Sequence, residues 1–487
     1  MMNKKMLTIE LLASGYRNQE FLPSEILDIY LNNIDEQTKI NAYISLYDEK
    51  AREIAAGHDK LFKDGKDLNI LCGIPISLKD IFLVKDELCT CGSKMLSNYI
   101  SNYDSTVKDN LTSKGAIIIG KTNMDEFAMG SSTETSFFGP TLNPWDHERV
   151  PGGSSGGSAA SVAGKLAVAS VGTDTGGSIR QPASFCGIVG LKPTYGRVSR
   201  FGMIAFASSL DQAGPLTLTV NDSAILLDAM SGFDERDTTS LKLPPTDCYK
   251  SLMDNKYEPK EFNIGIPYDL LNEGLDPEIE DNFNNLIVKL ERMGFGIRNI
   301  ELPSSKFAVA IYYIIAPSEA SSNLSRYDGI RYGFSKNLKS GSLDDFYVSN
   351  RSLGFGEEVK RRIMLGTYAL SSGYYDAYYL KAVRVKKMIE KDFIKAFSKV
   401  DCILSPTSPE LPFKLGEKKN NPLSMYLSDI LTIPANLAGL PSISIPFSTS
   451  KSNLPIGLQL TSDKLCEESL LKVSSMIEKE VNFKNKF

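Results

Sequence analysis

The sequence is most informative in two segments rich in glycine and serine: Arg149-Val-Pro-Gly-Gly-Ser-Ser-Gly-Gly-Ser-Ala-Ala160 and Val171-Gly-Thr-Asp-Thr-Gly-Gly-Ser-Ile-Arg180. Segments of this composition are often flexible linkers. Here, however, apolar secondary structure is predicted on both sides of each segment, which a linker does not need. Glycines beside an apolar strand let the backbone approach a ligand or adopt positive φ. They also free backbone N–H groups to point at one spot, as an oxyanion hole requires.

Predicted strands and helices alternate around these two segments. Short apolar or β-branched runs predict strands at residues 74–79, 115–120, 166–171 and 188–191, and helical periodicity predicts helices at 105–114 and 221–230. The strand–helix–strand pattern is repeated over 263–302, and further strands are predicted at 400–405, 442–445 and 457–460. We therefore expect an α/β fold with a central mixed, mostly parallel β-sheet that is covered by helices.

The whole chain, residues 1–487, is expected to form one large domain with four parts. Residues 1–65 have the pattern of a helical segment, and residues 66–235 hold the glycine-rich segments and form the core. Residues 236–400 are a helical elaboration rich in tyrosine, and residues 401–487 supply strands and a helix that complete the core.

Net charge and histidine content argue against several classes of protein. The chain has 54 Lys and Arg against 59 Asp and Glu, which gives a formal net charge of −5. This balance disfavours a domain that binds nucleic acid mainly through phosphates. Only two histidines are present, His58 and His147. We therefore expect no metal site and no histidine base.

The cysteines and the apolar runs indicate a cytoplasmic protein that does not contact a membrane. Of seven cysteines only Cys89 and Cys91 are close together, and one intervening residue does not make a metal-binding pair. Reduced thiols in a cytosolic compartment explain this distribution. The longest apolar stretch, near residues 308–316, is far shorter than the roughly 18 residues that a spanning helix needs.

Three familiar sequence motifs match this chain by residue pattern, but the surrounding sequence does not fit any of them. Residues 115–122 spell a phosphate-binding loop, but the four spacer residues are the predicted strand itself. Residues 152–156 spell the nucleophile elbow of hydrolases, whose histidine follows the nucleophile, whereas both histidines precede residue 152. Residues 174–176 resemble one half of an aspartic-protease pair, and only one copy exists.

Lys79 closes the predicted strand 74–79. A lysine in such a position is usually a surface residue whose ammonium reaches water. If it is buried instead, desolvation disfavours the ammonium, and the neutral amine can act as a base. The strand alone favours the surface interpretation, but the combination of Lys79 with both glycine-rich segments favours the base.

These three elements together resemble the amidase signature enzymes. The spacing of 24 residues between Ser154 and Ser178 fits that family, as does the block Gly187-Ile-Val-Gly-Leu-Lys-Pro-Thr-Tyr-Gly-Arg197. The signature covers about residues 70–215. The blocks at 120–132, 318–333 and 433–441 are similar to the branch of the family that hydrolyses glutamine within tRNA-dependent amidotransferases, so the resemblance covers nearly the whole chain.

The resemblance implies a Ser–Ser–Lys triad. Ser178 would be the nucleophile that forms an acyl ester, Ser154 the bridging serine of a charge relay, and Lys79 the general base. A serine hydroxyl is a poor nucleophile until a neighbouring base takes its proton, so these roles are chemically coherent. The oxyanion hole would be formed by backbone N–H groups of Thr175, Gly176 and Gly177, together with that of the nucleophile.

The resemblance also implies that the substrate is free glutamine. Arg362 is assigned to its α-carboxylate, although the neighbouring Arg361 is an open alternative. Asp429 is assigned to the α-ammonium, and Tyr313 to a wall of the site and a hydrogen-bond donor. From the residues alone, surface charge and a core tyrosine are the preferred explanations of these positions.

The partners that follow from the resemblance are subunits B and C of a heterotrimer. Ammonia would pass to a partner that holds charged tRNA, ATP and Mg²⁺ and converts Glu-tRNA(Gln) to Gln-tRNA(Gln), with Asp-tRNA(Asn) left open as a second substrate. No cofactor is expected in this chain itself. Two alternatives are a free-standing amidase with the same triad acting on another small amide, and a catalytically silent scaffold. The intact triad argues against the scaffold.

Overall fold

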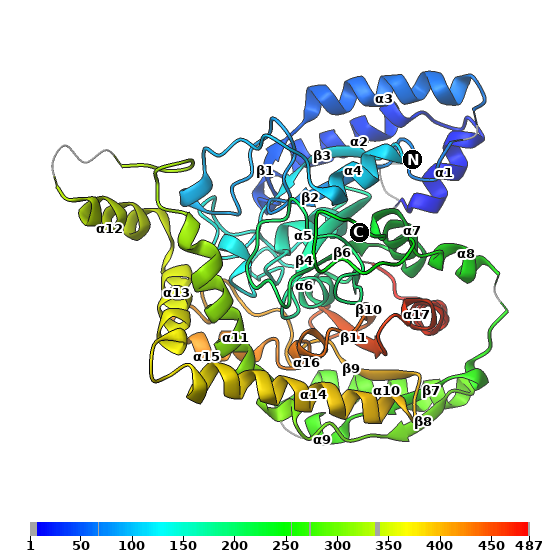
Figure 1. Ribbon diagram of the computed structural model, residues 1–487. Helices are drawn as coiled ribbons and strands as arrows, with labels where there is room; N and C mark the ends of the chain where they lie inside the picture. The colour runs from blue at the N-terminus through cyan, green and yellow to red at the C-terminus, as the bar shows by residue number, and fades with distance from the viewer. Residues whose placement is uncertain (1–6, 67, 255, 272–273, 337–340, 486–487) are drawn as a thin grey trace.

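A mixed β-sheet runs through the centre of the protein, and helices surround it (Figure 1). The computed structural model describes residues 7–66, 68–254, 256–271, 274–336 and 341–485. Residues 1–6 of the predicted N-terminal helical segment, and residues 337–340 of the predicted helical elaboration, lie outside the described residues. The division of the chain at residues 65, 235 and 400 stays a prediction.

The described residues form an 11-stranded sheet with the order β1-β3-β2-β4-β6-β5-β10-β11-β9-β7-β8. The strands are β1 (Tyr43–Leu46), β2 (Pro75–Lys79), β3 (Ile117–Thr122), β4 (Ala169–Asp174), β5 (Val189–Lys192), β6 (Gln212–Thr217), β7 (Asn263–Ile266), β8 (Gly296–Asn299), β9 (Cys402–Pro406), β10 (Ser442–Thr449) and β11 (Pro455–Ser462). Strands β7 to β11 from the second half of the chain thus extend the sheet that the first half begins.

The expectation of a mixed sheet is confirmed, but the expectation that it is mostly parallel is wrong. Among the described strands, four neighbouring pairs are parallel and six are antiparallel. One cause is β6, which the sequence did not predict and which lies antiparallel to both β4 and β5. Its residues Gln212-Ala-Gly-Pro-Leu-Thr217 lack β-branched periodicity. A second cause is β1, a strand within the predicted helical segment 1–65, which pairs antiparallel with β3. A third is the hairpin of β10 and β11, because a short turn can join only antiparallel strands.

Seventeen α-helices are found in the described part of the chain. They are α1 (Ile9–Arg17), α2 (Pro23–Glu36), α3 (Asp48–Lys63), α4 (Thr106–Ser113), α5 (Gly156–Ala163), α6 (Arg180–Cys186), α7 (Val220–Met230), α8 (Cys248–Met253), α9 (Tyr268–Leu271), α10 (Pro277–Met293), α11 (Ala308–Asn323), α12 (Leu343–Gly354), α13 (Glu357–Leu370), α14 (Lys381–Phe397), α15 (Pro422–Leu427), α16 (Ile433–Leu437) and α17 (Glu467–Val481). A π-helix, η8 (Asp376–Leu380), directly precedes α14.

The longer helices follow from local sequence signals. Helix α10 begins after Asp276, whose side chain accepts a hydrogen bond from the N–H of Glu278, and it ends at Gly294 with φ of 102°. Its buried residues recur at helical spacing, so one face packs on the sheet. Helix α8 was not predicted, because its six residues are too few to show a period; two of its N–H groups are held by the carboxylate of Asp228.

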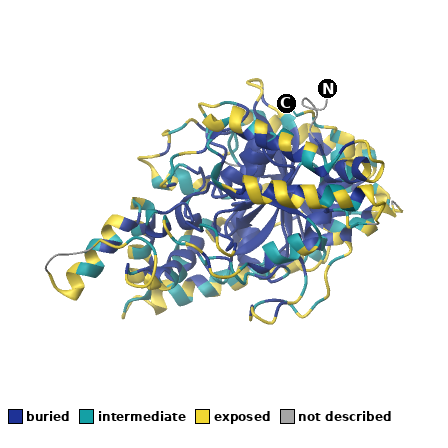
Figure 2. Cartoon of the chain, turned by 90° about the horizontal axis from the view of Figure 1, so that it is seen from above, coloured by how far each residue is buried: buried dark blue, intermediate teal, exposed yellow. Residues whose placement is uncertain are grey.

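The centre of the sheet is fully buried, as the dark blue strands of Figure 2 show. Strand β2 lies parallel to β4, with Ile76 opposite Ala169 and Leu78 opposite Val171. The carboxyl ends of parallel neighbours meet at the same edge of a sheet, which is where ligands bind in α/β folds. This register therefore brings Lys79, the last residue of β2, next to the glycine-rich segment that follows β4.

Candidate active site

Lys79 is completely buried at the end of β2. Its Nζ lies 2.7 Å from Ser154 Oγ, 2.9 Å from Ser155 Oγ and 2.9 Å from Thr173 Oγ1. Both glycine-rich segments thus supply hydroxyls to one amine. The alternative that Lys79 is a surface residue is wrong, because the parallel neighbours β3 and β4 enclose the end of β2.

Burial lowers the pKa of Lys79 from 10.5 to about 7. Desolvation is the dominant cause, since the low-dielectric interior disfavours the ammonium. The carboxylates of Asp125, Asp174 and Asp211 act in the opposite direction, because negative charge nearby favours the ammonium. A substantial fraction of this amine is therefore neutral near pH 7 and has a lone pair available to accept a proton.

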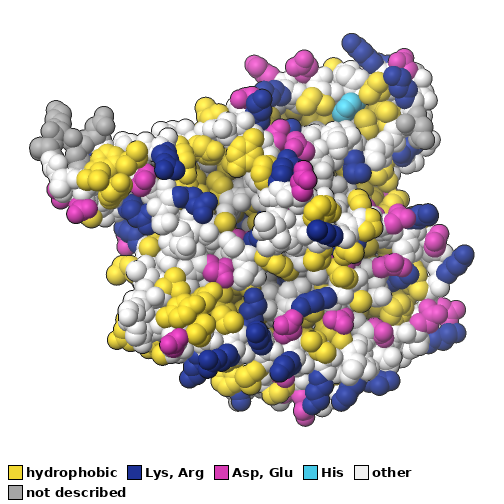
Figure 3. Space-filling model, in the orientation of Figure 1, with side chains coloured by type: hydrophobic (Ala, Val, Ile, Leu, Met, Phe, Trp, Pro, Cys, Tyr) yellow, Lys and Arg dark blue, Asp and Glu magenta, His cyan; other side chains and the backbone are white. Residues whose placement is uncertain are grey.

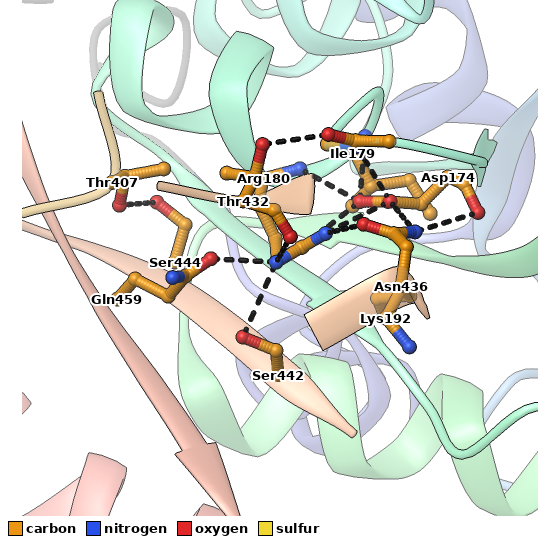
Figure 4. A network of polar contacts seen from close by, with 12 residues as sticks. Asp174, Ile179, Arg180, Lys192, Thr407, Thr432, Asn436, Ser442, Ser444 and Gln459 are labelled. Carbon is orange, nitrogen blue, oxygen red and sulfur yellow. Dashed lines mark hydrogen bonds and ion pairs between the residues drawn. The ribbon is translucent and has the colours of Figure 1, made fainter. Parts of the chain in front are cut away.

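The second glycine-rich segment forms a tight loop between β4 and α6, and Asp174 organises it (Figure 4). The carboxylate of Asp174 accepts hydrogen bonds from the N–H of Gly177 (2.8 Å) and the N–H of Ile179 (3.2 Å). These bonds fold the chain back on the end of β4, so Ser178 is presented between them. The N–H of Ser155 donates to the carbonyl of Ser178 at 3.2 Å, which joins the two segments.

A buried ion pair between Arg180 and Asp174 holds this loop in place. The guanidinium of Arg180 contacts the carboxylate of Asp174 through Nε and Nη2, both at 3.0 Å. Its remaining donors reach Gln459 on β11 and Asn436 on α16 (Figure 4). Although desolvation alone would raise the pKa of Asp174, the charge and hydrogen bonds of Arg180 hold that pKa at about 2. The carboxylate therefore stays ionised and keeps its N–H donors.

The three residues predicted for the oxyanion hole lie in this loop. The N–H of Gly177 donates to Asp174. Within the described residues, the N–H groups of Thr175, Gly176 and Ser178 have no hydrogen-bond partner in the protein. Gly176 and Gly177 occupy positions that do not accommodate a side chain. A Cβ at Gly176 would lie 2.8 Å from the ring of Tyr312, and Gly177 has φ of +136°.

Asp429, predicted to bind an ammonium group, lies against the same loop. Its Oδ2 accepts a hydrogen bond from the hydroxyl of Ser131, whereas its Oδ1 is buried without a partner among the described residues. A Cβ at Gly177 would lie 3.3 Å from this Oδ1. Burial raises the pKa of Asp429 to about 7. A cation that fills this position would both satisfy Oδ1 and favour the carboxylate.

Arg362 is buried on α13, and its neighbour Arg361 is exposed. The Nε of Arg362 lies 2.8 Å from Glu358 Oε1, and its guanidinium lies 5.1 Å from the ring centroid of Tyr313. The ring of Tyr313 stacks on that of Tyr426, with centroids 3.7 Å apart. The two predicted substrate residues on α11 and α13 are therefore in contact, and the difference in burial favours Arg362 over Arg361.

A cavity of about 610 Å³ opens beside these residues. Its lining includes both arginines, Tyr426, Ser131 and Glu126. The predicted triad is not part of the lining. Ser131 donates a hydrogen bond to Asp429, which lies against Gly177. Ser131 and Asp429 therefore link the wall of the cavity to the loop that bears Ser178.

Comparison with known proteins places this chain in a family. The family model described as "Amidase" matches residues 25–471, which is most of the chain. The chain belongs to the amidase family. It is similar to the A subunit of glutamyl-tRNA(Gln) amidotransferase from Geotalea daltonii, with 51% identity over 98% of each chain. It is also similar to the A subunit of the same enzyme from Trichodesmium erythraeum, with 52% identity over 94% of this chain and 95% of the relative.

Two solved structures share the fold of this amidase. The crystal structure of the A subunit of glutamyl-tRNA(Gln) amidotransferase from Thermotoga maritima has a TM-score of 0.79 and 39% identity, and the match covers 98% of this chain and 95% of the other. The peptide amidase of Stenotrophomonas maltophilia has a TM-score of 0.80 and 26% identity, over 98% and 97% of the two chains. The expected amidase signature fold is thereby confirmed.

The structure adds residues to this amidase site that the sequence did not single out. Ser155 and Thr173 hold Lys79, and the hydroxyl of Thr432 donates to the carbonyl of Gly176 at 2.7 Å. Tyr312 packs on Gly176. Ser155 and Thr173 lie inside the two glycine-rich segments, which is a signal that could have found them. Tyr312 and Thr432 come from distant helical regions and carry no such signal.

The described residues of the amidase contain no group of three or more His, Cys, Asp or Glu side chains placed to hold a metal ion. None of the described helices is both long enough and apolar enough to cross a lipid bilayer.

Proposed function

We propose that this chain is the glutamine-hydrolysing component of a glutamyl-tRNA(Gln) amidotransferase, which releases ammonia from free glutamine. The observation that supports a free amino acid as substrate is the unpartnered Oδ1 of Asp429, buried against the nucleophile loop. Together with the buried guanidinium of Arg362, whose charge acts on Asp429, it offers one anion and one cation to a substrate. An α-ammonium and an α-carboxylate complement these two charges.

Ser178 is the proposed nucleophile. Its hydroxyl proton passes to Ser154, while the proton of Ser154 passes to the neutral amine of Lys79, 2.7 Å away. The Ser178 oxygen attacks the side-chain carbonyl of glutamine. Ammonia then leaves with a proton returned along the same relay, and a glutamyl ester remains. Water, deprotonated by the same route, hydrolyses this ester to glutamate and restores the enzyme.

The oxyanion of the tetrahedral intermediate is proposed to accept the N–H groups of Thr175, Gly176 and Ser178. The family resemblance implied Gly177 as a fourth donor, but its N–H already donates to Asp174. We therefore give Gly177 a different part, which is to turn the loop so that its neighbours point at the substrate. Each such donor contributes about 3 kcal/mol to lowering the barrier.

The ammonia is proposed to pass to a partner subunit that binds charged tRNA, ATP and Mg²⁺, within a heterotrimer in the cytoplasm. This partner would amidate Glu-tRNA(Gln), and whether it serves Asp-tRNA(Asn) lies with its own site. The support is the name of the relatives, each of which is called the A subunit of an amidotransferase. Ammonia that escaped into water would be protonated and lost as a nucleophile, so direct transfer between docked subunits is the chemical requirement.

An exposed apolar face beside the cavity supports docking of this partner. In Figure 3 hydrophobic side chains gather at the lower left, over the part of the molecule that α13, α14 and α15 form in Figure 1. The exposed residues of this part include Met364, Leu365, Tyr368, Tyr374, Tyr375, Tyr378 and Leu423. A hollow of about 560 Å³ on α13 adjoins the substrate cavity, since Glu357 and Arg361 line both. Aromatic-rich exposed surface of this kind is typical of protein interfaces.

Glutamine turnover tests the proposed function. The purified chain should release ammonia from glutamine, and the rate should rise when the partner subunits, ATP and charged tRNA are added. Release is measured with a coupled ammonia assay. Rapid hydrolysis of aryl amides by the isolated chain, with no activity on glutamine, would instead identify a free-standing amidase.

Arg362→Gln should raise the KM for glutamine by about thirtyfold or more, because a charge-assisted hydrogen bond to the carboxylate is lost. Arg361→Gln is the matched control. Its side chain is 45% exposed and forms a surface ion pair with Glu358, so its removal should change KM by less than about twofold. Steady-state kinetics on both variants give the two values.

The two arginine variants also test the assignment itself. A larger increase in KM for Arg361→Gln than for Arg362→Gln would make the exposed arginine the carboxylate ligand. If the KM were unchanged in both variants, neither arginine of α13 would bind the substrate carboxylate.

A further inference from the structure

The turn at residues 125–128 connects the catalytic loop to the helix that carries Arg362. Phe127 and Ala128 have φ of 49° and 60°, a conformation that non-glycine residues rarely adopt. Two such residues in succession, both buried, are retained only where the surrounding contacts fix them. The contacts on each side of the turn therefore indicate what it holds in place.

One side of the turn holds the relay serine. The N–H of Asp125 donates to the carbonyl of Ser154 at 3.2 Å. The carboxylate of Asp125 accepts the N–H of Thr133 at 2.9 Å and the hydroxyl of Thr135 at 2.8 Å. A Cβ at Gly153 would lie only 2.1 Å from Asp125 Oδ2, so the chain just before Ser154 is packed directly on this carboxylate.

The other side of the turn holds the start of α13. Glu126 is 3% exposed, and its Oε2 accepts the N–H of Gly356 at 2.8 Å. Gly356 is the residue before α13, six positions ahead of Arg362. A Cβ there would lie 2.3 Å from the same Oε2, so the close approach requires glycine. The ring of Phe127 adds a second contact, 5.7 Å from the ring of Phe355.

Glu126 has no assigned role in the proton relay or in binding substrate. The hydroxyl of Ser93 donates to its Oε1, and the N–H of Gly356 to its Oε2, so both oxygens have partners within the protein. Glu126, Gly356 and Arg362 all line the substrate cavity. The carboxylate of Glu126 also lies at the N-terminus of α13, where negative charge is favourable.

We propose that Glu126 is a positioning residue that sets the distance between the carboxylate anchor Arg362 and the Ser154–Ser178 pair. The inference rests on the proposed function, because it concerns how glutamine is held. Arg362 binds one end of the substrate and Ser178 attacks the other, so the amide reaches the nucleophile only if α13 has the correct placement. Glu126 fixes that placement through the N–H of Gly356, the residue just before the helix, on the same turn that holds Ser154. Misplacement of a substrate by about 1 Å can cost about a hundredfold in rate.

Glu126→Ala should raise the KM for glutamine about tenfold, because α13 loses its tether and Arg362 its fixed position. Glu126→Gln should restore the wild-type KM, because an amide oxygen can still accept the N–H of Gly356. Glu49→Ala is the matched control and should leave KM unchanged, since Glu49 is an exposed glutamate in the first turn of α3 and is not among the residues that line the cavity. Gly356→Ala disturbs the same contact from the helix side and should also raise KM, which covers the case that Glu126→Ala does not fold.

A double-mutant cycle separates positioning from a general loss of structure. In the Arg362→Gln background, Glu126→Ala should add less than about twofold to KM, because the group that it positions is already absent. Full multiplication of the two effects, or a KM unchanged in both Glu126→Ala and Gly356→Ala, would overturn the inference while leaving the proposed function intact. Absence of glutamine hydrolysis in the wild-type chain would be a failure of the proposed function instead.

Discussion

Ser178→Ala should reduce glutamine hydrolysis by about 10⁴-fold or more, with little effect on the binding of glutamine. Removal of the nucleophile leaves only the contribution of the oxyanion donors and of substrate positioning. The Ser178 side chain is not needed for the fold of the loop, which Asp174 and Arg180 hold. Glutamate and ammonia release by the variant, and its melting temperature, are the quantities to measure.

A control variant and a threshold of residual activity decide whether Ser178 is the nucleophile. Ser113→Ala makes the same chemical change at an exposed residue near the end of α4, and its activity should equal that of the wild type. If Ser178→Ala kept more than about one part in a hundred of the wild-type kcat, another group would be the nucleophile.

Lys79→Met should have an effect of similar size, a loss of about 10³-fold or more in kcat. Methionine approximates the length of the lysine side chain but cannot accept a proton, and it leaves the hydroxyls of Ser154, Ser155 and Thr173 without their common partner. The structural cost should stay moderate, because the hydroxyl of Ser155 keeps its hydrogen bonds to the backbone of Thr173. Activity and melting temperature are measured on the same preparation.

The pH dependence of wild-type kcat tests the same residue without a substitution. Only neutral Lys79 can accept the proton, and its pKa is lowered to about 7 by burial. As pH falls below about 7 the amine becomes protonated, so log kcat should fall with a slope of about one, and it should level off above about pH 8. A profile that is flat down to about pH 5.5, or that rises in acid, would exclude a lysine base.

Much of the catalytic core could be predicted because its signals are local. Lys79 ends a run of apolar residues that can only be a strand, and β4 follows the first glycine-rich segment at close range. The parallel pairing of β2 and β4 then follows from the alternation of strand and helix. The observed β4 extends three residues beyond the predicted strand 166–171, through Thr173 to Asp174. That extension is what brings the hydroxyl of Thr173 to Lys79.

The substrate side of the site could not be derived from local patterns. Arg361 and Arg362 are adjacent on α13, and which of them is buried depends on how this helix packs against α11. Likewise, nothing in the segment 171–180 shows that the N–H of Gly177 donates to Asp174, because this sequence is compatible with several loop conformations. Such details depend on contacts with Ser131, Tyr312 and Asp429, which are far away in the sequence.

Covalent trapping with a glutamine-analogue electrophile is the sharpest test of Ser178 as the nucleophile. The reagent should label the peptide containing Ser178 in the wild-type chain, and glutamine should protect against labelling. Ser178→Ala should remain unlabelled by intact-protein and peptide mass spectrometry. Equal labelling of Ser178→Ala, or a label carried by one of the cysteines, would contradict the assignment of Ser178.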